Sequence, residues 1–250
     1  MSIVVHIPHS STLIPAAERS AFVLNDEALR AELLRMTDAY TDELFAPWAD
    51  DVTAVVYPYS RLLVDPERFR EDAEEPMAAR GMGAVYTRTS HGEPLRARRG
   101  DPERLRLLTA YYDPHHRALA EAVAAKLQRH GRCLVVDAHS FRSRPLPCDV
   151  HQSPNRPDIC IGTDPFHTPP ALAQRAVDAF AAEGWSVAVN RPYAGALVPI
   201  EVYGVDARVS AIMVEVRRGL YMNEATGERL TNLAGIRAQL AQALSGLRLS

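Results

Sequence analysis

The sequence predicts an α/β fold with a mostly parallel sheet that is covered by helices on both faces. Short apolar or β-branched runs alternate along the chain with longer segments of helical periodicity. Several of these runs are apolar throughout rather than alternating, as expected of strands that are buried on both faces. The length of 250 residues fits a single α/β domain that spans residues 1–250.

The composition is ordinary for a globular protein, with 47% hydrophobic and 24% charged residues. A net charge of −3 gives no reason to expect a nucleic acid or a membrane as partner. The first residues lack a positively charged leader, and no apolar run approaches the length of about 20 residues that a membrane helix needs. The three cysteines lack CxxC spacing and predict reduced thiols in a cytoplasmic protein, without a thiolate zinc site.

The chain is predicted to open with a strand and a long helix. Ile3–Ile7 is a β-branched run that stops at a proline, so His9 is expected on an exposed turn. A helix is predicted over residues 26–45, because apolar side chains recur on one face at helical spacing. On its other face this helix would carry Asp38 and, one turn later, Asp42.

A second strand, an irregular segment and another long helix are predicted to follow. Val52–Tyr57 is interpreted as the strand. The stretch 70–100 is charged and rich in glycine and proline, and its length indicates a functional loop or lid. Pro102 at a first helical turn begins an amphipathic segment that reaches about Gln128, with a break near Asp113–Pro114.

The second half of the chain is predicted to contain four strands and two helices. Leu134–Val136 is interpreted as a buried strand whose polar end, at Asp137, His139 and Ser140, faces a crevice. The same patterns predict strands over Ile159–Gly162, Trp185–Val189 and Ala211–Val216, and helices over 168–183 and from Thr231 onward.

Four apolar runs end on side chains that can perform chemistry: His9, Arg61 to Arg68, His139 and Glu215. Because the carboxyl ends of parallel strands lie along one edge of a sheet, we expect these side chains to lie close together. Two histidines and a carboxylate suit zinc, and three protein ligands leave a position open for water. A free carboxylate would take the proton of that water, and arginines would hold an anionic substrate or stabilise an oxyanion.

Each of these residues also has a structural interpretation. A histidine can be satisfied by a carbonyl, Glu215 can form a salt bridge with a neighbouring arginine, and the arginines can pair with Asp65 and Glu67. A third interpretation makes Ser140 or Ser10 a nucleophile, but neither serine lies in a G-x-S-x-G turn.

Several segments resemble the N-formylglutamate amidohydrolase (formylglutamate deformylase) family. They are His-Ile-Pro-His-Ser-Ser, Ser-Arg-Leu-Leu-Val-Asp-Pro-Glu-Arg, Val-Asp-Ala-His-Ser and Val-Glu-Val-Arg-Arg-Gly-Leu-Tyr-Met, together with Thr-Asp-Ala-Tyr-Thr-Asp at 37–42 and Asn-Arg-Pro-Tyr-Ala-Gly at 190–195. They occur in the family's order over most of the chain. The resemblance implies a three-layer α/β/α fold like that of the zinc carboxypeptidases. It also implies hydrolysis of a small anionic substrate, an N-formyl or other N-acyl amino acid.

The resemblance, which extends to aspartoacylase, implies roles for single residues. His9 and His139 would hold a divalent metal, most simply zinc. Arg61 would polarise the scissile carbonyl, and Arg68 would bind the substrate carboxylate. Glu215 would be the general acid and base.

The chain departs from the related motifs at two positions and in the loop after Gly195, which reads Ala-Leu-Val-Pro-Ile-Glu and lacks the Gly-Gly and the basic residues of the formylglutamate enzymes. Thr12 stands where the superfamily's His-x-x-Glu motif has its glutamate, so the third metal ligand must come from elsewhere. Asp38 is the candidate, with Asp42 as the second choice. Glu67 stands where the related Asp-Leu-Asn-Arg motif has asparagine, which is expected to add negative charge beside Arg68.

Three further residues, Asn190, Tyr193 and Arg217, are expected to bind substrate, with Tyr193 either closing over it or packing against the protein. The sequence thus predicts a metal-dependent amidohydrolase. The alternatives are a hydrolase of a larger N-acyl amino acid or small peptide, and a catalytically silent protein that binds an anionic metabolite through Arg61 and Arg68.

Overall fold

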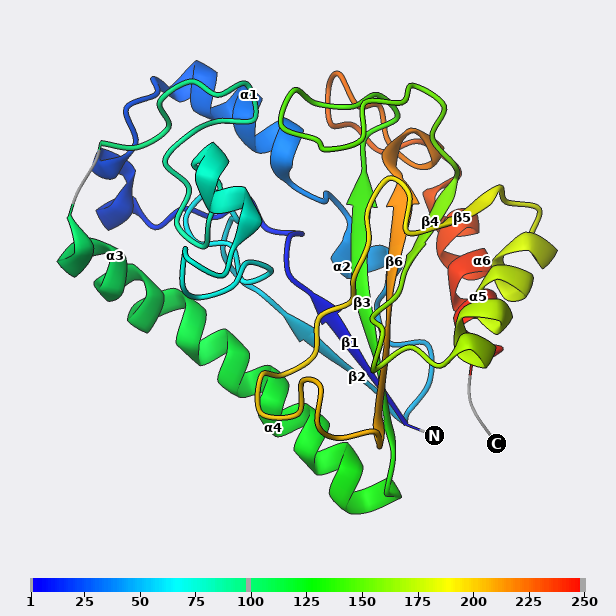
Figure 1. The fold of residues 1–250 in the computed structure, drawn as a ribbon. Helices are drawn as coiled ribbons and strands as arrows, with labels where there is room; N and C mark the ends of the chain where they lie inside the picture. Colours follow the sequence, from blue (N-terminus) through cyan, green and yellow to red (C-terminus); the bar gives the residue numbers. More distant parts are fainter. Residues whose placement is uncertain (1, 98–99, 248–250) are drawn as a thin grey trace.

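The computed structural model describes residues 2–97 and 100–247 (Figure 1). Its six strands form one mixed sheet in the order β2-β1-β3-β6-β4-β5, in which only the β4–β6 pair is antiparallel. The predicted α/β class with a mostly parallel sheet is therefore confirmed. The strands are β1 (Ser2–Ile7), β2 (Val52–Val56), β3 (Cys133–Phe141), β4 (Ile159–Gly162), β5 (Val187–Val189) and β6 (Val209–Arg217).

Helices cover both faces of the sheet, as Figure 1 shows. On one face, Val135 of β3 packs with Leu119 and Val123 of α4 (Asp113–His130). On the other face, Val136 packs in a larger core that includes residues of α2 (Thr41–Leu44), α5 (Pro170–Ala182) and α6 (Leu233–Ser245). Successive strand residues point to opposite faces, so an unbroken apolar run supplies both cores. No helix in the described part of the chain is long and apolar enough to cross a membrane.

The helix predicted over residues 26–45 is two helices. α1 (Asp26–Met36) ends before Thr37, and α2 begins only after Tyr40, which adopts the left-handed conformation with φ 66°. Asp38 lies in this break, where its N–H donates to the carbonyl of His9 (2.9 Å). The break thus carries Asp38 off the helix surface and places it beside the turn that follows β1.

The helix is not interrupted near Asp113–Pro114, where a break was predicted. α3 (Asp101–Leu107) continues through a π-helical segment, Leu108–Tyr112, directly into α4. Proline cannot donate the backbone hydrogen bond of a regular helical turn, and a wider turn accommodates that loss while the helix goes on. The segment 70–97 is irregular as predicted, apart from the short 3₁₀ helix Pro76–Arg80.

β3 is longer than predicted, and its extra length positions the site. It continues beyond Val136 to Phe141, because β6 pairs with it along its whole length. β1 ends earlier, and its last register pair with β3 joins His6 to Asp137. His139 therefore projects from a part of β3 that β1 no longer flanks, and Asp137 from the last paired position, both on the face that α4 covers further down.

We expect Phe180→Ala to lower the free energy of unfolding by about 3–5 kcal/mol, because the ring is fully buried between α5 and the sheet and its loss leaves a cavity. Urea denaturation followed by circular dichroism measures the change. Phe166→Ala is the matched control, because that ring is 45% exposed and its loss should change the unfolding free energy by about 0.5 kcal/mol or less. Equal effects of both substitutions would contradict the assigned core.

Candidate active site

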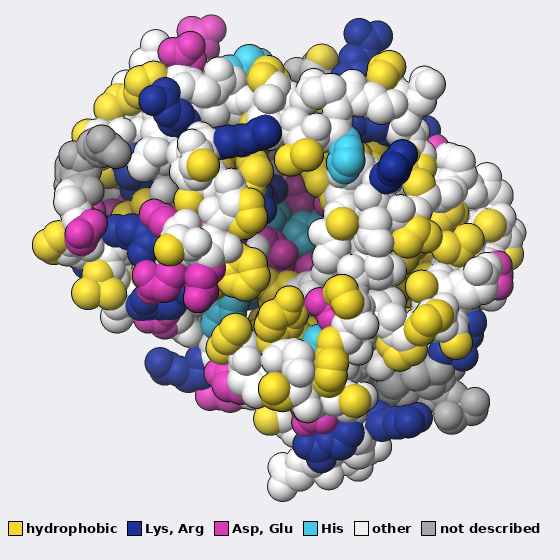
Figure 2. Space-filling model, in the orientation of Figure 1, with side chains coloured by type: hydrophobic (Ala, Val, Ile, Leu, Met, Phe, Trp, Pro, Cys, Tyr) yellow, Lys and Arg dark blue, Asp and Glu magenta, His cyan; other side chains and the backbone are white. Residues whose placement is uncertain are grey.

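A cavity of about 1060 Å³ opens where β1, β3 and β6 end. Figure 2 shows it as a hollow with acidic and histidine side chains on its floor and apolar side chains around its rim. Its walls come from the loops that follow β3 and β5, from segment 67–82 and from the first half of α4. The cavity thus occupies the edge of the sheet at which the sequence predicted ligand binding.

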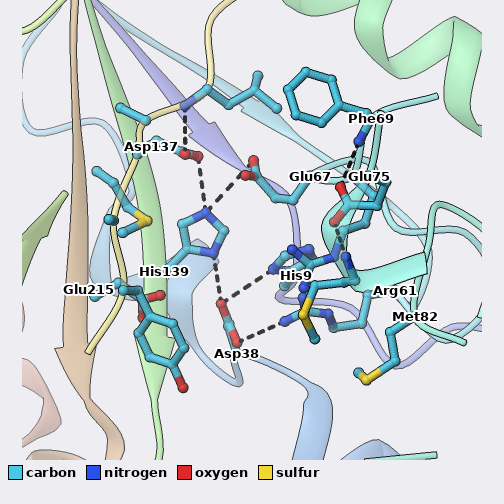
Figure 3. Close-up of a pocket in the computed structure, with 18 of the residues that line it drawn as sticks. His9, Asp38, Arg61, Glu67, Phe69, Glu75, Met82, Asp137, His139 and Glu215 are labelled. Carbon is cyan, nitrogen blue, oxygen red and sulfur yellow. Dashed lines mark hydrogen bonds and ion pairs between the residues drawn. The ribbon is translucent and has the colours of Figure 1, made fainter. Parts of the chain in front are cut away.

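His9, Asp38 and His139 meet on the floor of the cavity (Figure 3). Oδ2 of Asp38 lies 3.1 Å from Nδ1 of His139 and 3.6 Å from Nδ1 of His9. The two imidazole rings are 5.0 Å apart, and all three side chains are almost fully buried. Residues from three distant parts of the chain therefore offer one ligand atom each to a common point, within 4.8 Å of one another.

Asp65 orients His9. Its Oδ1 lies 2.7 Å from Nε2 of His9, and its Oδ2 accepts hydrogen bonds from Arg61 and from the hydroxyl of Tyr86. Burial favours the protonated acid, but the charge of Arg61 and the hydrogen bond from His9 outweigh it and hold the pKa of Asp65 well below its usual range. Because an ionised carboxylate only accepts, Nε2 of His9 carries the proton and Nδ1 is left with a free lone pair.

Asp137 orients His139 in the same way, through the Nε2 atom of the ring. Its Oδ1 lies 3.1 Å from Nε2 of His139 and 3.0 Å from Nδ1 of His6, and its Oδ2 accepts the N–H of Leu197 (3.1 Å). The bond to Leu197 ties the loop after β5, which forms a cavity wall, to the strand that carries His139.

His6 supplies the positive charge beneath this cluster. Burial lowers its pKa, but bonds to Asp137 and Glu67 outweigh burial and raise the pKa to about 9. Burial lowers the pKa of His115 to about 2, so this ring is neutral and accepts a hydrogen bond from Nε2 of His6 (2.8 Å). His115 therefore has a structural role, as the acceptor that satisfies His6.

Glu67 lies elsewhere than expected from the sequence. Its carboxylate faces Nδ1 of His6 (3.1 Å) and Nε2 of His139 (3.7 Å), so its negative charge is balanced by histidines rather than placed against Arg68. The expectation that Glu67 disturbs the guanidinium of Arg68 was wrong, because the side chain turns toward the floor of the cavity.

The His9, Asp38 and His139 cluster has the chemistry of a metal site. Nδ1 of His9 is a buried nitrogen without a hydrogen-bond partner. His139 faces carboxylates on both ring nitrogens, which raise its pKa well above the usual range against the effect of burial. A cation can take the place of its Nδ1 proton. Carboxylates on the far ring nitrogens, here Asp65 and Asp137, are the usual outer partners of metal-binding histidines.

Glu215 stands next to His139. The two residues are register partners on adjacent strands, so their side chains leave the same face of the sheet. Oε2 of Glu215 has no hydrogen-bond partner, and burial raises the pKa of this carboxyl to about 8. A carboxyl with a pKa near neutrality can both take up and release a proton at working pH.

Arg61 and Arg68 both line the cavity. Arg61 donates to Asp65 through Nε and Nη2, which leaves Nη1 directed toward Asp38, 4.0 Å from Oδ1. Nε of Arg68 is buried without a hydrogen-bond partner, and its nearest carboxylate oxygen, of Asp65, is 3.6 Å away. Arg68 thus has unused donors in the cavity.

The other predicted site residues are placed differently. Tyr193 lines the cavity, but its hydroxyl is bonded to Asp149 and Arg156. Asn190 and Arg217 do not line it: Asn190 bonds to Thr163 through its side-chain amide, and Arg217 forms an ion pair with Asp158. The expectation that both contact a substrate in the cavity disagrees with these contacts. Asp42, the second choice for the third ligand, is exposed on α2.

Three residues of the site were not assigned from the sequence: Asp65, Asp137 and Arg218. Asp137 precedes His139 by two residues, a spacing that puts both on one face of a strand and could have identified it. Arg218, rather than Arg217, enters the cavity, where its Nη2 donates to Asp38 Oδ1 (2.7 Å). Against the effect of burial, the contacts with His139 and His9, together with the charge of Arg218, keep the pKa of Asp38 well below its usual range.

Comparisons with known proteins agree with this geometry. The model of the family described as N-formylglutamate amidohydrolase matches residues 1–222. The chain is 32% identical over 232 residues to an N-formylglutamate deformylase of Pseudomonas aeruginosa, covering 89% of this chain and 82% of that protein.

Two solved structures are similar as well. The N-formylglutamate amidohydrolase from Ralstonia eutropha aligns with a TM-score of 0.82 at 26% identity, over 99% of this chain and 92% of that one. A gene product of Agrobacterium tumefaciens shares the fold, with a TM-score of 0.66 at 20% identity over 98% and 90% of the two chains. The match over residues 1–222, which contain every cavity residue discussed above, confirms the resemblance, and the chain belongs to the N-formylglutamate amidohydrolase family.

Proposed function

We propose that this protein is a metal-dependent amidohydrolase that cleaves the amide bond of an N-formyl amino acid such as N-formylglutamate. The name of the Pseudomonas aeruginosa relative supports the substrate. The observation that carries the metal dependence is the buried, unbonded Nδ1 of His9, which shares the carboxylate of Asp38 with Nδ1 of His139. Two imidazoles and one carboxylate are a ligand set that suits zinc.

His9, Asp38 and His139 would hold the ion, which when bound supplies Lewis-acid activation of water and of the amide carbonyl. Asp65 and Asp137 fix the ring orientations by accepting the outer N–H groups. Their role in the reaction is to keep both Nδ1 atoms aimed at the floor of the cavity.

Arg68 binds the α-carboxylate of the substrate through its unused donors, as a guanidinium commonly does with a carboxylate. Arg61 stabilises the oxyanion that develops on the formyl oxygen. Its Nε and Nη2 are held rigidly by Asp65, and Nη1 remains to donate.

Glu215 moves the proton. As a carboxylate it takes one proton from the attacking water while the oxygen adds to the formyl carbon. It then passes this proton to the amide nitrogen as the C–N bond breaks, which releases formate and the free amino acid. Burial and an unbonded Oε2 leave the carboxyl available for both transfers.

We expect the purified protein to contain zinc, and we expect removal of the metal by a chelator to abolish formate release until zinc is restored. His9→Ala and His139→Ala should each weaken metal binding by at least the roughly 10–100-fold that loss of an outer partner causes. Elemental analysis and a formate assay measure both effects. Asp42→Ala removes an exposed carboxylate nearby and should leave metal content unchanged. Full activity in a protein shown to be metal-free would refute the proposal.

Glu215→Gln should lower kcat for an N-formyl amino acid by about 10²–10⁴-fold, because the amide cannot accept the proton of water. Metal content and the circular dichroism spectrum should not change. Glu201→Gln is the matched control, since this glutamate also lines the cavity but is exposed and lies on the loop after β5. Turnover within a few-fold of the unmodified enzyme would exclude Glu215 as the proton carrier.

A further inference from the structure

Three arginines gather on the wall of the cavity where β3 and α1 end: Arg35, Arg142 and Arg218. Burial, together with the positive charges of Arg218 and Arg35, lowers the pKa of Arg142. Like charges in a partly buried wall repel one another, and an anion between them would relieve the repulsion. Arg61 and Arg68 line the same cavity but belong to the segment that follows β2.

Asp38 lies between the two groups of arginines. Its Oδ1 accepts from Nη2 of Arg218 at 2.7 Å and lies 4.0 Å from Nη1 of Arg61. Arg61 and Arg218 thus both approach Asp38 of the metal-ligand cluster, and Arg68, Arg35 and Arg142 line the same cavity.

All three nitrogens of the Arg218 guanidinium are hydrogen-bonded to other groups of the protein. Its Nε donates to the hydroxyl of Ser140 (3.1 Å), its Nη1 to the carbonyl of Arg35 (2.6 Å) and its Nη2 to Asp38. Its role is to hold Asp38 and the end of α1 in place.

Arg142 is far less committed. Its Nε lies 3.7 Å from the carboxylate of Glu224 and its Nη1 is 3.4 Å from the carbonyl of the same residue, both at or beyond the limit of a hydrogen bond. The Glu224 carboxylate is already bound at short range by the N–H and the hydroxyl of Ser143. The guanidinium of Arg142 thus lines the cavity with donors that no other described side chain occupies closely.

Arg35 has a similar position. Only its Nη1 donates, to Glu32 at 3.1 Å, and that buried carboxylate also accepts from the N–H and the hydroxyl of Ser90. The Arg35 side chain is 38% exposed, so its remaining donors are open to the cavity.

Short stretches of chain connect both arginines to the metal-ligand cluster. Arg35 precedes Asp38 by three residues, and Arg142 follows His139 by three residues. The apolar side chains Met36 and Leu146 line the same cavity and pack in one hydrophobic cluster. An aliphatic substrate side chain can cross this apolar surface before it reaches the guanidinium groups.

We infer that Arg142 and Arg35 form a second anion subsite, which binds the side-chain carboxylate of a dicarboxylic N-formyl amino acid. The inference rests on the proposed function, which places the α-carboxylate on Arg68. It assigns to Arg142 and Arg35 the selection of acidic over neutral substrate side chains.

The test compares N-formyl-L-glutamate with its neutral isostere N-formyl-L-glutamine. In the unmodified enzyme kcat/KM should be about 10–100-fold higher for the glutamate substrate, the range expected for a hydrogen-bonded charge pair. Arg142→Gln should remove most of this preference and leave kcat/KM for the glutamine substrate unchanged. Arg35→Gln should have the same effect to a smaller degree, because that side chain is more exposed.

Arg144→Gln is the matched control. It makes the same change of charge on the same loop, but Arg144 is exposed and does not line the cavity, so both substrates should be unaffected. Binding of glutarate and butyrate, measured by calorimetry, gives a second readout that does not depend on turnover. Glutarate should bind more tightly than butyrate, and Arg142→Gln should remove the difference.

Two results would overturn the subsite: no preference for the acidic substrate in the unmodified enzyme, or an equal loss for both substrates in Arg142→Gln. Either result leaves hydrolysis of N-formyl amino acids intact. If the metal-loaded enzyme hydrolyses neither substrate, the proposed function is wrong. The binding measurement then tests the subsite by itself: tighter binding of glutarate than of butyrate supports it, and equal binding refutes it.

Discussion

The site depends on the bond between a buried carboxylate and the far nitrogen of each histidine. Asp65 holds Nε2 of His9, and Asp137 holds Nε2 of His139. Each bond fixes a tautomer and a ring orientation, and together they aim both Nδ1 atoms at Asp38. Without these bonds each histidine ring could rotate, or its proton could move to the other nitrogen. The proximity of His9, Asp38 and His139 would then not be enough to form a set of metal ligands.

Buried carboxylates are costly, and the surrounding residues show how the protein stabilises them. Asp65 is neutralised by Arg61, Asp38 by Arg218, and Asp137 by His6. His6 and Arg218 are themselves buried and bonded to further groups, and Arg61, which is partly exposed, also lies 4.0 Å from Asp38, so the charges form a connected network around the cavity floor. Removing one member would leave an uncompensated charge, which explains why the site extends well beyond the three candidate ligands.

The sequence was sufficient to predict the parts that follow from strand topology. Parallel strands bring His9 and His139 to one edge of the sheet, and β6 adds Glu215 beside them, as the structure places them. Asp38 was proposed on the resemblance to related motifs, but within an unbroken helix, because apolar spacing does not reveal a break that depends on left-handed Tyr40. Arg217 was expected to bind substrate, but β6 ends at this residue, and Arg218, the next residue along the chain, lines the cavity instead.

The unequal lengths of the strands connect these observations. β3 and β6 run side by side to Phe141 and Arg217, whereas β1 stops beside Asp137. The missing neighbour leaves the edge of β3 beside His139 without a partner strand, and the chain that leaves β1 brings His9 into the space. The break after α1 brings Asp38 into the same space, where its N–H donates to the carbonyl of His9. A β1 strand that continued beside His139 would occupy the space that His9 now fills, so the step in the sheet is what allows polar side chains from five elements to share one cavity.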